Sequence, residues 1–594
     1  MDKEKLFDKL IWIYVLLLGL VFVFMIPPFQ HADETQHFFR AASVMSGQIF
    51  CKSDDVGPYI KLPKAYYDLP TQLGYGIIVS SNKMLFPRNN FRFGLSRNTY
   101  WNDLSRVDSC LPPLGYIPSL LGMWLLRFNP LLSLYAGRIT SFLFFCICMR
   151  LGFKIIPSQY KKFLYIYCLI PMVIHQATGI SYDVVQVSLA ILLVSMFFSF
   201  IAEKSISLSK IIIFWLIVVW VALSKQSYFL IGLLFLFVDR KKIAKNLKHY
   251  LLITFFYFSA YGFVLVLYNR IFGFPTKIFP WLLNIPLQIV IIKNDPLYFL
   301  SALGNVFKYN IDFYIKSIIG VFGETDSEIG LLPYSLIILL IGYFTNLYIG
   351  TVSVVKMSVR WIFLFFVFLL FSTSIIFGSL FVGANVIGSN IINGIQGRYF
   401  LIYLPFILFC FVELIRYLAK WKKMWLFQIV VLVMIIGNVG YTVYVRYFDL
   451  SKNIINKDSL KNEIVYLTDK KVVFTDIKID KLYEFKYDLN NTNGKKIIGF
   501  QLDTATNSAY LNLPYKYFIK DENCNKIIRQ GYLNLGLLQS GGIYEDLFRA
   551  INTQSNILCL SFKPLVYYDD NWNYLRLVIY EGRPLFKFLY ADYY

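Results

Sequence analysis

The sequence lacks the motifs of nucleotide-driven and zinc chemistry. It has no P-loop, G-x-S-x-G or nucleotide-binding glycine pattern, so ATP-driven cytosolic chemistry has no support. Its eight cysteines show no C-x-x-C or Cys/His spacing that would indicate zinc. No small-x-small cleavage site follows the first apolar segment, where "HADETQHFF" stands instead. Segment 10–27 is therefore predicted to be a retained span rather than a signal peptide.

Charged residues are scarce and hydrophobic residues are abundant. Asp, Glu, Lys and Arg make up 16% of the 594 residues, hydrophobic residues make up 57%, and the mean hydropathy is +0.54. This balance excludes an ordinary soluble globular protein and predicts a polytopic α-helical membrane protein. The net charge of +22 does not indicate nucleic-acid binding, because the basic residues lie in short loops between apolar segments. We expect contact with the lipid bilayer and no nucleic-acid partner.

Apolar segments alternate with short basic loops along residues 1–450. A span needs about 20 apolar residues, and short loops rich in Lys and Arg face the cytoplasm. The two rules predict about eleven spans, with the N-terminus inside and the C-terminal part outside. A single buried helix over 211–238 is the alternative to two short spans there. The predicted spans are 10–27, 132–150, 163–178, 184–202, 211–224, 227–238, 251–269, 331–350, 361–382, 400–417 and 425–446.

Two long segments are predicted to lie outside the membrane, at about 28–130 and 270–330. In the second segment the apolar stretches are broken by Pro, which favours interfacial helices over spans. Residues 451–594 change to short alternating runs separated by Asn, Asp and Gly, which predicts an extracytoplasmic all-β sandwich domain of about eight strands. The aromatic residues of this domain suit sugar stacking and packing equally.

Four cysteines lie in the segments predicted to be outside. Cys51 and Cys110 share the first outer loop, and Cys524 and Cys559 share the β-domain. Each pair can form a disulfide in an oxidising compartment, and reduced structural cysteines are the alternative.

Polar residues that can do chemistry gather on the predicted outer side. In "ADETQHFFRA", a helix would place Asp33, Glu34 and His37 on one face, where they can bind a metal ion or hold a general base. The alternative is that Asp33 caps the helix while Glu34 and Arg40 are solvated. Asp183, in "ISYDVVQ", is a lone acid at the start of a span, and a helix N-cap is again the alternative.

Cations follow later in the chain. Lys225 and Tyr228 lie in "LSKQSYF", where the cation can hold an anionic headgroup or extend to the interface. In "IQGRYFLIYLP", Gln396, Arg398 and Tyr399 open a predicted span, and the planar fork of Arg suits phosphate oxygens. These side chains are candidates for binding a phosphate.

Six sequence blocks carry a resemblance to a known family. They are "PPFQHADETQHFFRA", "CLPPLGYIPSLLG" with "YAGRI", "PMVIHQATGISYD", "LSKQSYF", "PLQIVIIKNDP" and "IQGRYFLIYLP". Over roughly residues 20–420, the chain resembles the bacterial membrane proteins of domain-of-unknown-function family 2142, placed with the C-type glycosyltransferase superfamily. The chain departs from the family pattern at Ala32 and Gln226, where Pro is common, and these changes alter loop stiffness more than chemistry.

The resemblance implies an enzyme of the bacterial cytoplasmic membrane. Such an enzyme transfers a sugar from a polyprenyl-phosphate donor to a cell-envelope glycan acceptor on the outer face, with an essential acid in the first outer loop. On this basis Asp33 is the first choice as general base and Glu34 the second. The alternatives are a lipid-linked glycan polymerase or ligase, a flippase or transporter, and a scaffold of envelope polysaccharide assembly.

The resemblance also suggests roles for the remaining candidates. Asp183 orients the acceptor, or joins Asp33 at a divalent ion such as Mg²⁺ or Mn²⁺; metal dependence and oligomeric state stay open. Side chains expected to bind the substrate or its phosphate are His37, Arg40, Lys225, Tyr228, Gln396, Arg398 and Tyr399.

Overall fold

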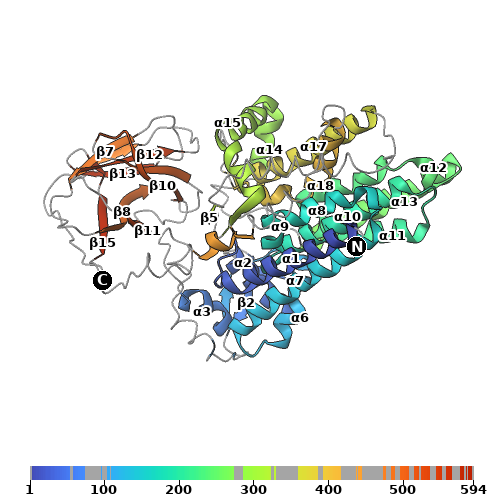
Figure 1. Cartoon of the computed structure of the whole chain (residues 1–594), viewed down its shortest axis with the longest axis horizontal. Coiled ribbons are helices and arrows are strands. Elements are labelled where there is room, and N and C mark those ends of the chain that lie inside the picture. The colour runs from blue at the N-terminus through green and yellow to red at the C-terminus, as the bar shows by residue number, and fades with distance from the viewer. Residues whose placement is uncertain are drawn as a thin grey trace.

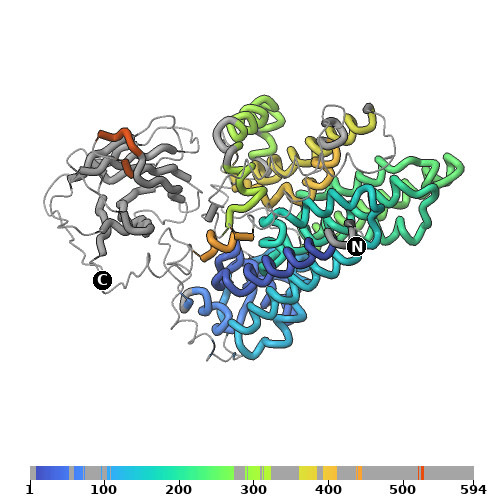
Figure 2. The backbone as a smooth tube through the Cα atoms, in the orientation of Figure 1, coloured from blue at the N-terminus to red at the C-terminus, as the bar shows by residue number. Residues whose placement is uncertain are grey.

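A computed structural model of the chain consists of a large helical part followed by β-strands (Figure 1). It describes residues 3–53, 58–73, 95, 99, 104–107, 109–272, 285–322, 327–328, 359–385, 392, 394–415, 436–437 and 439–444, then strands between 473 and 591 with the turn 523–526 (Figure 1). Figure 2 traces the helical part as a tube coloured along the chain. The predicted span 331–350 and most of the predicted span 425–446 lie outside the described residues.

Five described helices are long and apolar enough to cross a membrane. They are α1 (Lys3–Met25), α7 (Pro130–Ile155), α10 (Asp183–Ala202), α13 (Leu247–Phe272) and α17 (Val359–Ala384). Each coincides with a predicted span, because a helix rises about 1.5 Å per residue and must stay apolar over the whole hydrocarbon layer. The count of about eleven spans stays a prediction.

The predicted span 163–178 is not one helix. It is broken into α8 (Lys161–Leu169) and α9 (Pro171–Ala177), with Ile170 extended at φ −73° and ψ 116°. Pro171 has no N–H to continue α8, and its ring disfavours the helical conformation of the preceding residue. The sequence shows this Pro, and the span prediction did not use it.

Other predicted spans are shorter or irregular. The segment 211–238 divides at Lys225 into α11 (Leu208–Ser224) and η3 (Gln226–Phe237), and η3 is a 3₁₀ helix. Residues 397–415 begin with the short η4 (Gly397–Phe400) and continue as α18 (Leu404–Ile415). The division at Lys225 agrees with two short segments rather than one long helix.

The first predicted outer loop folds against the ends of α1 and α7. It contains α2 (Glu34–Met45), α3 (Lys64–Gln72), η1 (Pro113–Tyr116), α6 (Ile117–Leu125) and a sheet of β1 (Lys52–Ser53), β2 (Pro58–Pro63) and β3 (Leu104–Val107). A disulfide joins Cys51 to Cys110. Buried aromatic residues, among them Phe38 and Tyr66, form the core beneath this loop and fix α2 in place.

The second long outer segment contains two described helices and a short hairpin. These are α14 (Ile285–Asn294), α15 (Pro296–Gly320), β4 (Val321–Phe322) and β5 (Ser327–Glu328). Asp295 caps α15, because its carboxylate accepts hydrogen bonds from the backbone N–H groups of Leu297 and Tyr298 at 3.1 and 3.3 Å. Whether these helices are interfacial stays a prediction.

The C-terminal part is built of antiparallel strands. One sheet has the order β10-β9-β12-β7; the other has the order β11-β8-β13-β14, with β15 pairing β8 and β6 pairing β13. Cys524 is disulfide-bonded, and the side chain of Cys559 lies outside the described side chains. The strands are β6 (Val473–Asp476), β7 (Tyr483–Asp488), β8 (Lys496–Thr506), β9 (Pro514–Lys520), β10 (Ile527–Asn534), β11 (Ile543–Ile551), β12 (Ile557–Pro564), β13 (Leu575–Tyr580), β14 (Arg583–Pro584) and β15 (Phe586–Ala591).

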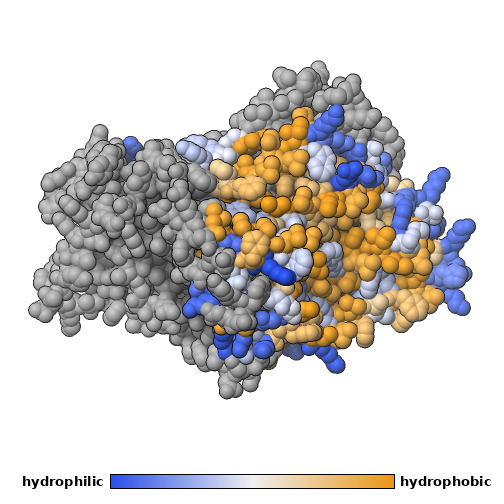
Figure 3. All heavy atoms as spheres, turned by 90° about the horizontal axis from the view of Figure 1, so that it is seen from below, coloured by the Kyte–Doolittle hydropathy of each residue, from blue (hydrophilic) through white to orange (hydrophobic). Residues whose placement is uncertain are grey.

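The helical part exposes a broad apolar surface (Figure 3). Large hydrophobic side chains point outward from α1, α13 and α17, including Leu17, Phe255 and Phe363. Continuous apolar surface of this extent on several helices is typical of contact with lipid tails.

Candidate functional site

Asp33 has an unusual conformation at the start of α2. It occupies the N-cap position in the left-handed region, with φ 61° and ψ 10°, and its side chain makes no capping hydrogen bond. Asp is one of the few residues other than Gly that adopt this region readily. Its carboxylate is therefore directed elsewhere, and the side chain is 51% exposed. The expected capping role is not observed.

The partner of Asp33 is Arg398, from the distant segment η4. Nη2 of Arg398 forms an ion pair with Oδ2 of Asp33, and Nη1 donates to the carbonyl of Ala32 at 3.1 Å. The side chain of Arg398 is only 3% exposed. A buried guanidinium needs such anionic and carbonyl partners, because an unpaired buried charge is costly.

Close backbone packing holds η4 in this position. The N–H of Gly397 donates to Oγ of Ser317 in α15 at 2.8 Å. A Cβ at Gly397 would lie 2.4 Å from the backbone nitrogen of Ile318, so no larger residue fits without a backbone shift. Gln396 is the N-cap of η4, and its carbonyl accepts the N–H of Tyr399 at 3.1 Å. Gln396 thus contributes through its backbone.

Asp183 and Lys225 complete the cluster from α10 and α11. Oδ2 of Asp183 lies 3.5 Å from Nε of Arg398, and its Oδ1 lies 3.9 Å from Nζ of Lys225. The two helices are joined here, because Gln186 of α10 donates to the carbonyl of Val221 at 3.4 Å. Two acids and two cations thus meet from four segments of the chain, and their formal charges balance.

Tyrosines surround the ammonium group of Lys225. Nζ lies 3.4 Å from the ring centroid of Tyr399, 5.0 Å from that of Tyr182 and 5.6 Å from that of Tyr228. These distances allow cation–π attraction. The hydroxyl of Tyr228 donates to the carbonyl of Tyr399 at 2.9 Å, so Tyr228 also supports η4.

His37 lies next to the cluster on the first turn of α2. Its Nδ1 is 2.7 Å from the hydroxyl of Tyr116, and its ring packs edge-on against Tyr182 at 4.6 Å. Burial lowers the pKa of His37 to about 4, although Asp33 and Asp183 oppose the shift. His37 is therefore neutral at pH 7 and can donate or accept one hydrogen bond through Nε2.

Several polar atoms at this cluster have no hydrogen-bond partner. They are Nε2 of His37, Oδ2 of Asp183, Nζ of Lys225 and Nε of Arg398, all buried within the described part of the chain. Buried polar atoms are almost always hydrogen-bonded, and exceptions at a shared location call for water or a ligand. This convergence marks the cluster as the candidate functional site.

Electrostatics keep Asp33 ionised. Burial alone raises the pKa of a carboxyl group, and at Asp33 the guanidinium of Arg398 outweighs that effect and lowers the pKa. Asp33 is thus a carboxylate at neutral pH. Lys225, which lies between α11 and η3, has its pKa lowered to about 8 by burial, although Asp183 opposes the shift.

Glu34 points away from the cluster and is fully buried. Its carboxylate binds Arg138 of α7, with 2.8 Å between Oε1 and Nε and an ion pair between Oε2 and Nη2. It also accepts the N–H groups of Phe29 at 2.9 Å and Ile180 at 3.3 Å. Arg138 in turn donates to three carbonyls, that of Val23 in the last turn of α1 and those of Ile26 and Pro27 just after it.

The sequence analysis did not single out Arg138. A charged residue inside a predicted span, as in "YAGRI", is a signal for a buried partner. The pair joins the segment that carries Asp33 to α7 and to the turn that precedes Asp183.

Arg40 also lies outside the cluster. It is buried and donates to the carbonyls of Leu111 at 2.6 Å, Gln48 at 3.1 Å and Ile49 at 2.6 Å. These bonds tie α2 to the loop around Cys51 and Cys110, so the described contacts of Arg40 are structural. The expected solvated alternative for Glu34 and Arg40 is wrong, because both side chains are buried.

His175 packs against His31. The two rings lie 4.3 Å apart between centroids, and both ring nitrogens of His31 are without a hydrogen bond. Among the described residues, no three His, Cys, Asp or Glu side chains are close enough together to hold a metal ion. The cation that Asp33 and Asp183 share is the guanidinium of Arg398.

These features define a membrane protein with several apolar helices and a cluster of paired charges at their ends. The chain belongs to the family described as "Predicted membrane protein (DUF2142)", which matches residues 16–445. The resemblance to this family is confirmed. No curated protein and no solved structure matches the chain.

Proposed function

We propose that the protein is a C-type integral-membrane glycosyltransferase. It transfers a sugar from a polyprenyl-phosphate donor to a cell-envelope glycan acceptor, on the outer face of the bacterial cytoplasmic membrane. The observation that carries the proposal is the meeting of Asp33, Asp183, Lys225 and Arg398 at the ends of apolar helices, where several buried polar atoms have no hydrogen-bond partner. A lipid-linked phosphate reaches such a location from the bilayer, and a soluble acceptor reaches it from the water.

Asp33 is the general base of this proposal. A sugar hydroxyl has a pKa far above 7, so a carboxylate must take its proton as the oxygen attacks the anomeric carbon of the donor. The side chain of Asp33 is half exposed, ionised and free of any capping bond. Glu34 does not share this role, because its oxygens already accept hydrogen bonds from Arg138, Phe29 and Ile180.

Arg398 and Lys225 bind the leaving phosphate. The bond between the anomeric carbon and the phosphate oxygen breaks, and negative charge develops on the phosphate. Preorganised cations stabilise this charge most where water is excluded. Asp183 holds both cations in place before the donor binds. Its role is thus to position Arg398 and Lys225, and a divalent ion is not required for that role.

The proposal includes the predicted topology. About eleven spans place the N-terminus inside, and the cluster and the C-terminal β-sandwich outside. In this arrangement the β-domain lies on the side of the acceptor glycan.

The test is linkage analysis of the envelope glycan in cells that carry the wild type, Asp33→Asn or a deletion of the gene. We expect both altered strains to lose the same sugar substituent and to accumulate its polyprenyl-phosphate donor. If Asp33→Asn leaves the glycan unchanged and the deletion alters it, the first loop is structural and a transport or scaffolding role is the better account. Immunoblotting of the membranes verifies equal amounts of protein.

A further inference from the structure

Cations gather at the end of α10 and α11 that lies opposite the candidate site. α10 begins with Asp183 and ends at Ala202, and α11 begins at Leu208 and ends next to Lys225. The 20 residues of α10 rise about 30 Å, which is about the thickness of the hydrocarbon core of a bilayer. The two polar regions therefore lie on opposite sides of an apolar layer.

The second region comprises two loops that are joined by a backbone hydrogen bond. The N–H of Ile206, after α10, donates to the carbonyl of Lys242 in α12 (Arg240–Ile243) at 2.8 Å. Five exposed cations line these loops, and we call them the basic end. They are Lys204, Arg240, Lys241, Lys245 and Lys248.

The carboxylates of the two loops have other partners. Glu203 accepts two hydrogen bonds from Lys210 at 2.6 and 2.7 Å. Asp239 caps α12 by accepting the backbone N–H of Lys241 at 3.0 Å. Lys242 is occupied as well, because its ammonium donates to the C-terminal carbonyls of α10.

The side chains of the basic end have no carboxylate within ion-pair distance among the described residues. Their positive charge is therefore not neutralised within this part of the chain. An anion from outside can bind them without breaking an existing pair.

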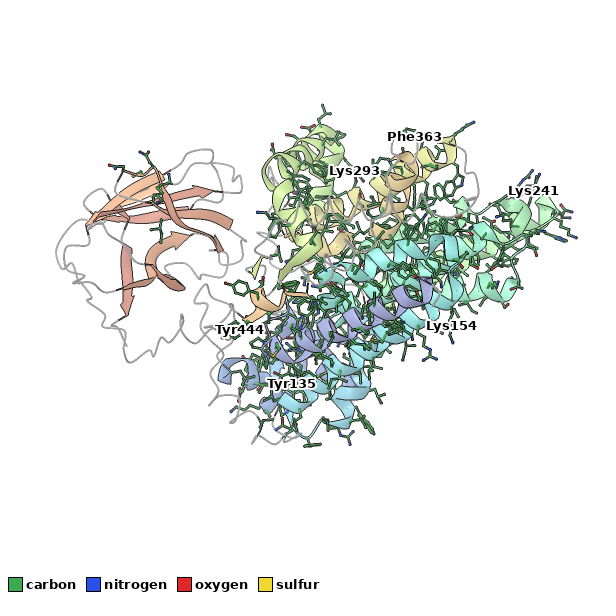
Figure 4. The ribbon with its side chains drawn as sticks, viewed as in Figure 1. Tyr135, Lys154, Lys241, Lys293, Phe363 and Tyr444 are labelled. Carbon is green, nitrogen blue, oxygen red and sulfur yellow. A yellow bond between two sulfur atoms is a disulfide. The ribbon has the colours of Figure 1, made fainter. Side chains whose placement is uncertain are left out.

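Apolar side chains adjoin the basic end. Leu208, Leu247 and Leu251 are 60%, 51% and 56% exposed. Figure 3 shows hydrophilic residues at this extremity beside a broad apolar surface, and Figure 4 shows Lys241 at one end of the helical part. Exposed leucines beside cations are typical of the boundary between acyl chains and headgroups.

We propose that the basic end binds the anionic headgroups of phospholipids in the leaflet that it meets. The charge is complementary to headgroup phosphates, and the adjoining leucines place it at headgroup depth. Each Lys or Arg near an anionic bilayer surface contributes about fivefold to the binding constant. This inference does not depend on the proposed catalytic activity.

The test uses full-length protein reconstituted in vesicles of phosphatidylcholine mixed with phosphatidylglycerol. Tryptophan quenching by brominated forms of each lipid gives the enrichment of the anionic lipid around the protein. We expect enrichment for the wild type and a loss of about tenfold or more when all five cations of the basic end are changed to Gln. The control changes four exposed lysines elsewhere, Lys52, Lys61, Lys64 and Lys293, to Gln and keeps the enrichment.

Two results would overturn the proposal. One is equal enrichment in the wild type and the basic-end variant. The other is an equal loss in the control variant, which would mean that net charge rather than this surface attracts the lipid. Unfolding temperatures in phosphatidylcholine alone, equal for the three proteins, verify that the variants are folded, and none of these results bears on transfer by the Asp33 site.

Discussion

Asp33 and Glu34 are neighbours in sequence, and the same isosteric change is expected to affect them in opposite ways. Glu34→Gln should destabilise the fold, while Asp33→Asn should remove the proposed activity and leave the fold intact. Asn is the right replacement at position 33, because it tolerates the left-handed conformation that Ala does not. The comparison separates a structural carboxylate from a chemical one.

The magnitude follows from burial. Both side chains of the Glu34–Arg138 pair are 0% exposed, and removing one partner of a buried ion pair costs about 3–5 kcal/mol because the other charge stays behind. Asp33 is 51% exposed, and an exposed ion pair contributes about 1 kcal/mol or less. Arg398 also keeps Asp183 as a partner in the Asp33→Asn variant.

The assay is denaturant-induced unfolding of the purified protein in detergent micelles, followed by tryptophan fluorescence. A double variant, Glu34→Leu with Arg138→Met, removes both charges together. We expect it to cost less than the sum of the single changes, because no buried charge is left unpaired. It should not be neutral, because the carbonyls of Val23, Ile26 and Pro27 lose their donor.

The reasoning is refuted if Glu34→Gln unfolds like the wild type, or if Asp33→Asn costs as much as Glu34→Gln. Additive single and double changes would also contradict the assigned pairing. Glycan analysis of the same variants gives the second readout: Asp33→Asn should lose the sugar substituent at wild-type protein levels.

Three further predictions concern the packing, the charge and the cross-link around the site. Gly397→Ala should lower the free energy of unfolding by about 1–3 kcal/mol and impair transfer, since the new Cβ would meet the backbone at Ser317. Denaturant unfolding and glycan analysis check this. Burial lowers the pKa of Lys225 to about 8. Donor binding should therefore weaken as pH rises through that value, because the ammonium loses its charge. If the Lys225→Arg variant shows the same decline, Lys225 does not cause it. Reduction of the Cys51–Cys110 disulfide, which spans 59 residues, should lower the free energy of unfolding by about 4 kcal/mol, because the unfolded chain gains loop entropy. An unchanged unfolding midpoint in reductant would contradict a stabilising role.

The fold class and most of the described spans were predictable from the sequence, because they depend on local composition. An apolar segment of about 20 residues must be helical in lipid, whatever lies next to it. The exception at 163–178 was local too, since Pro171 alone breaks the helix there. The sequence did not reveal that Asp33 adopts the left-handed conformation, so the alternative that it caps α2 stayed open until the structure was known.

Candidate residues of the site could be chosen from the sequence, but their partners could not. Asp33, Asp183, Lys225 and Arg398 are polar residues at membrane depth or beside it, and their cost in lipid makes each of them noticeable.

Which carboxylate meets which cation depends on contacts across more than one hundred residues of chain, such as those of Glu34 with Arg138. Asp33 precedes α2 in the left-handed conformation and faces Arg398, while Glu34 is the first residue of the helix and faces α7. The sequence by itself thus determined the membrane class and the list of candidates. Tertiary packing decided which acid is buried as part of the scaffold and which remains half exposed at the site.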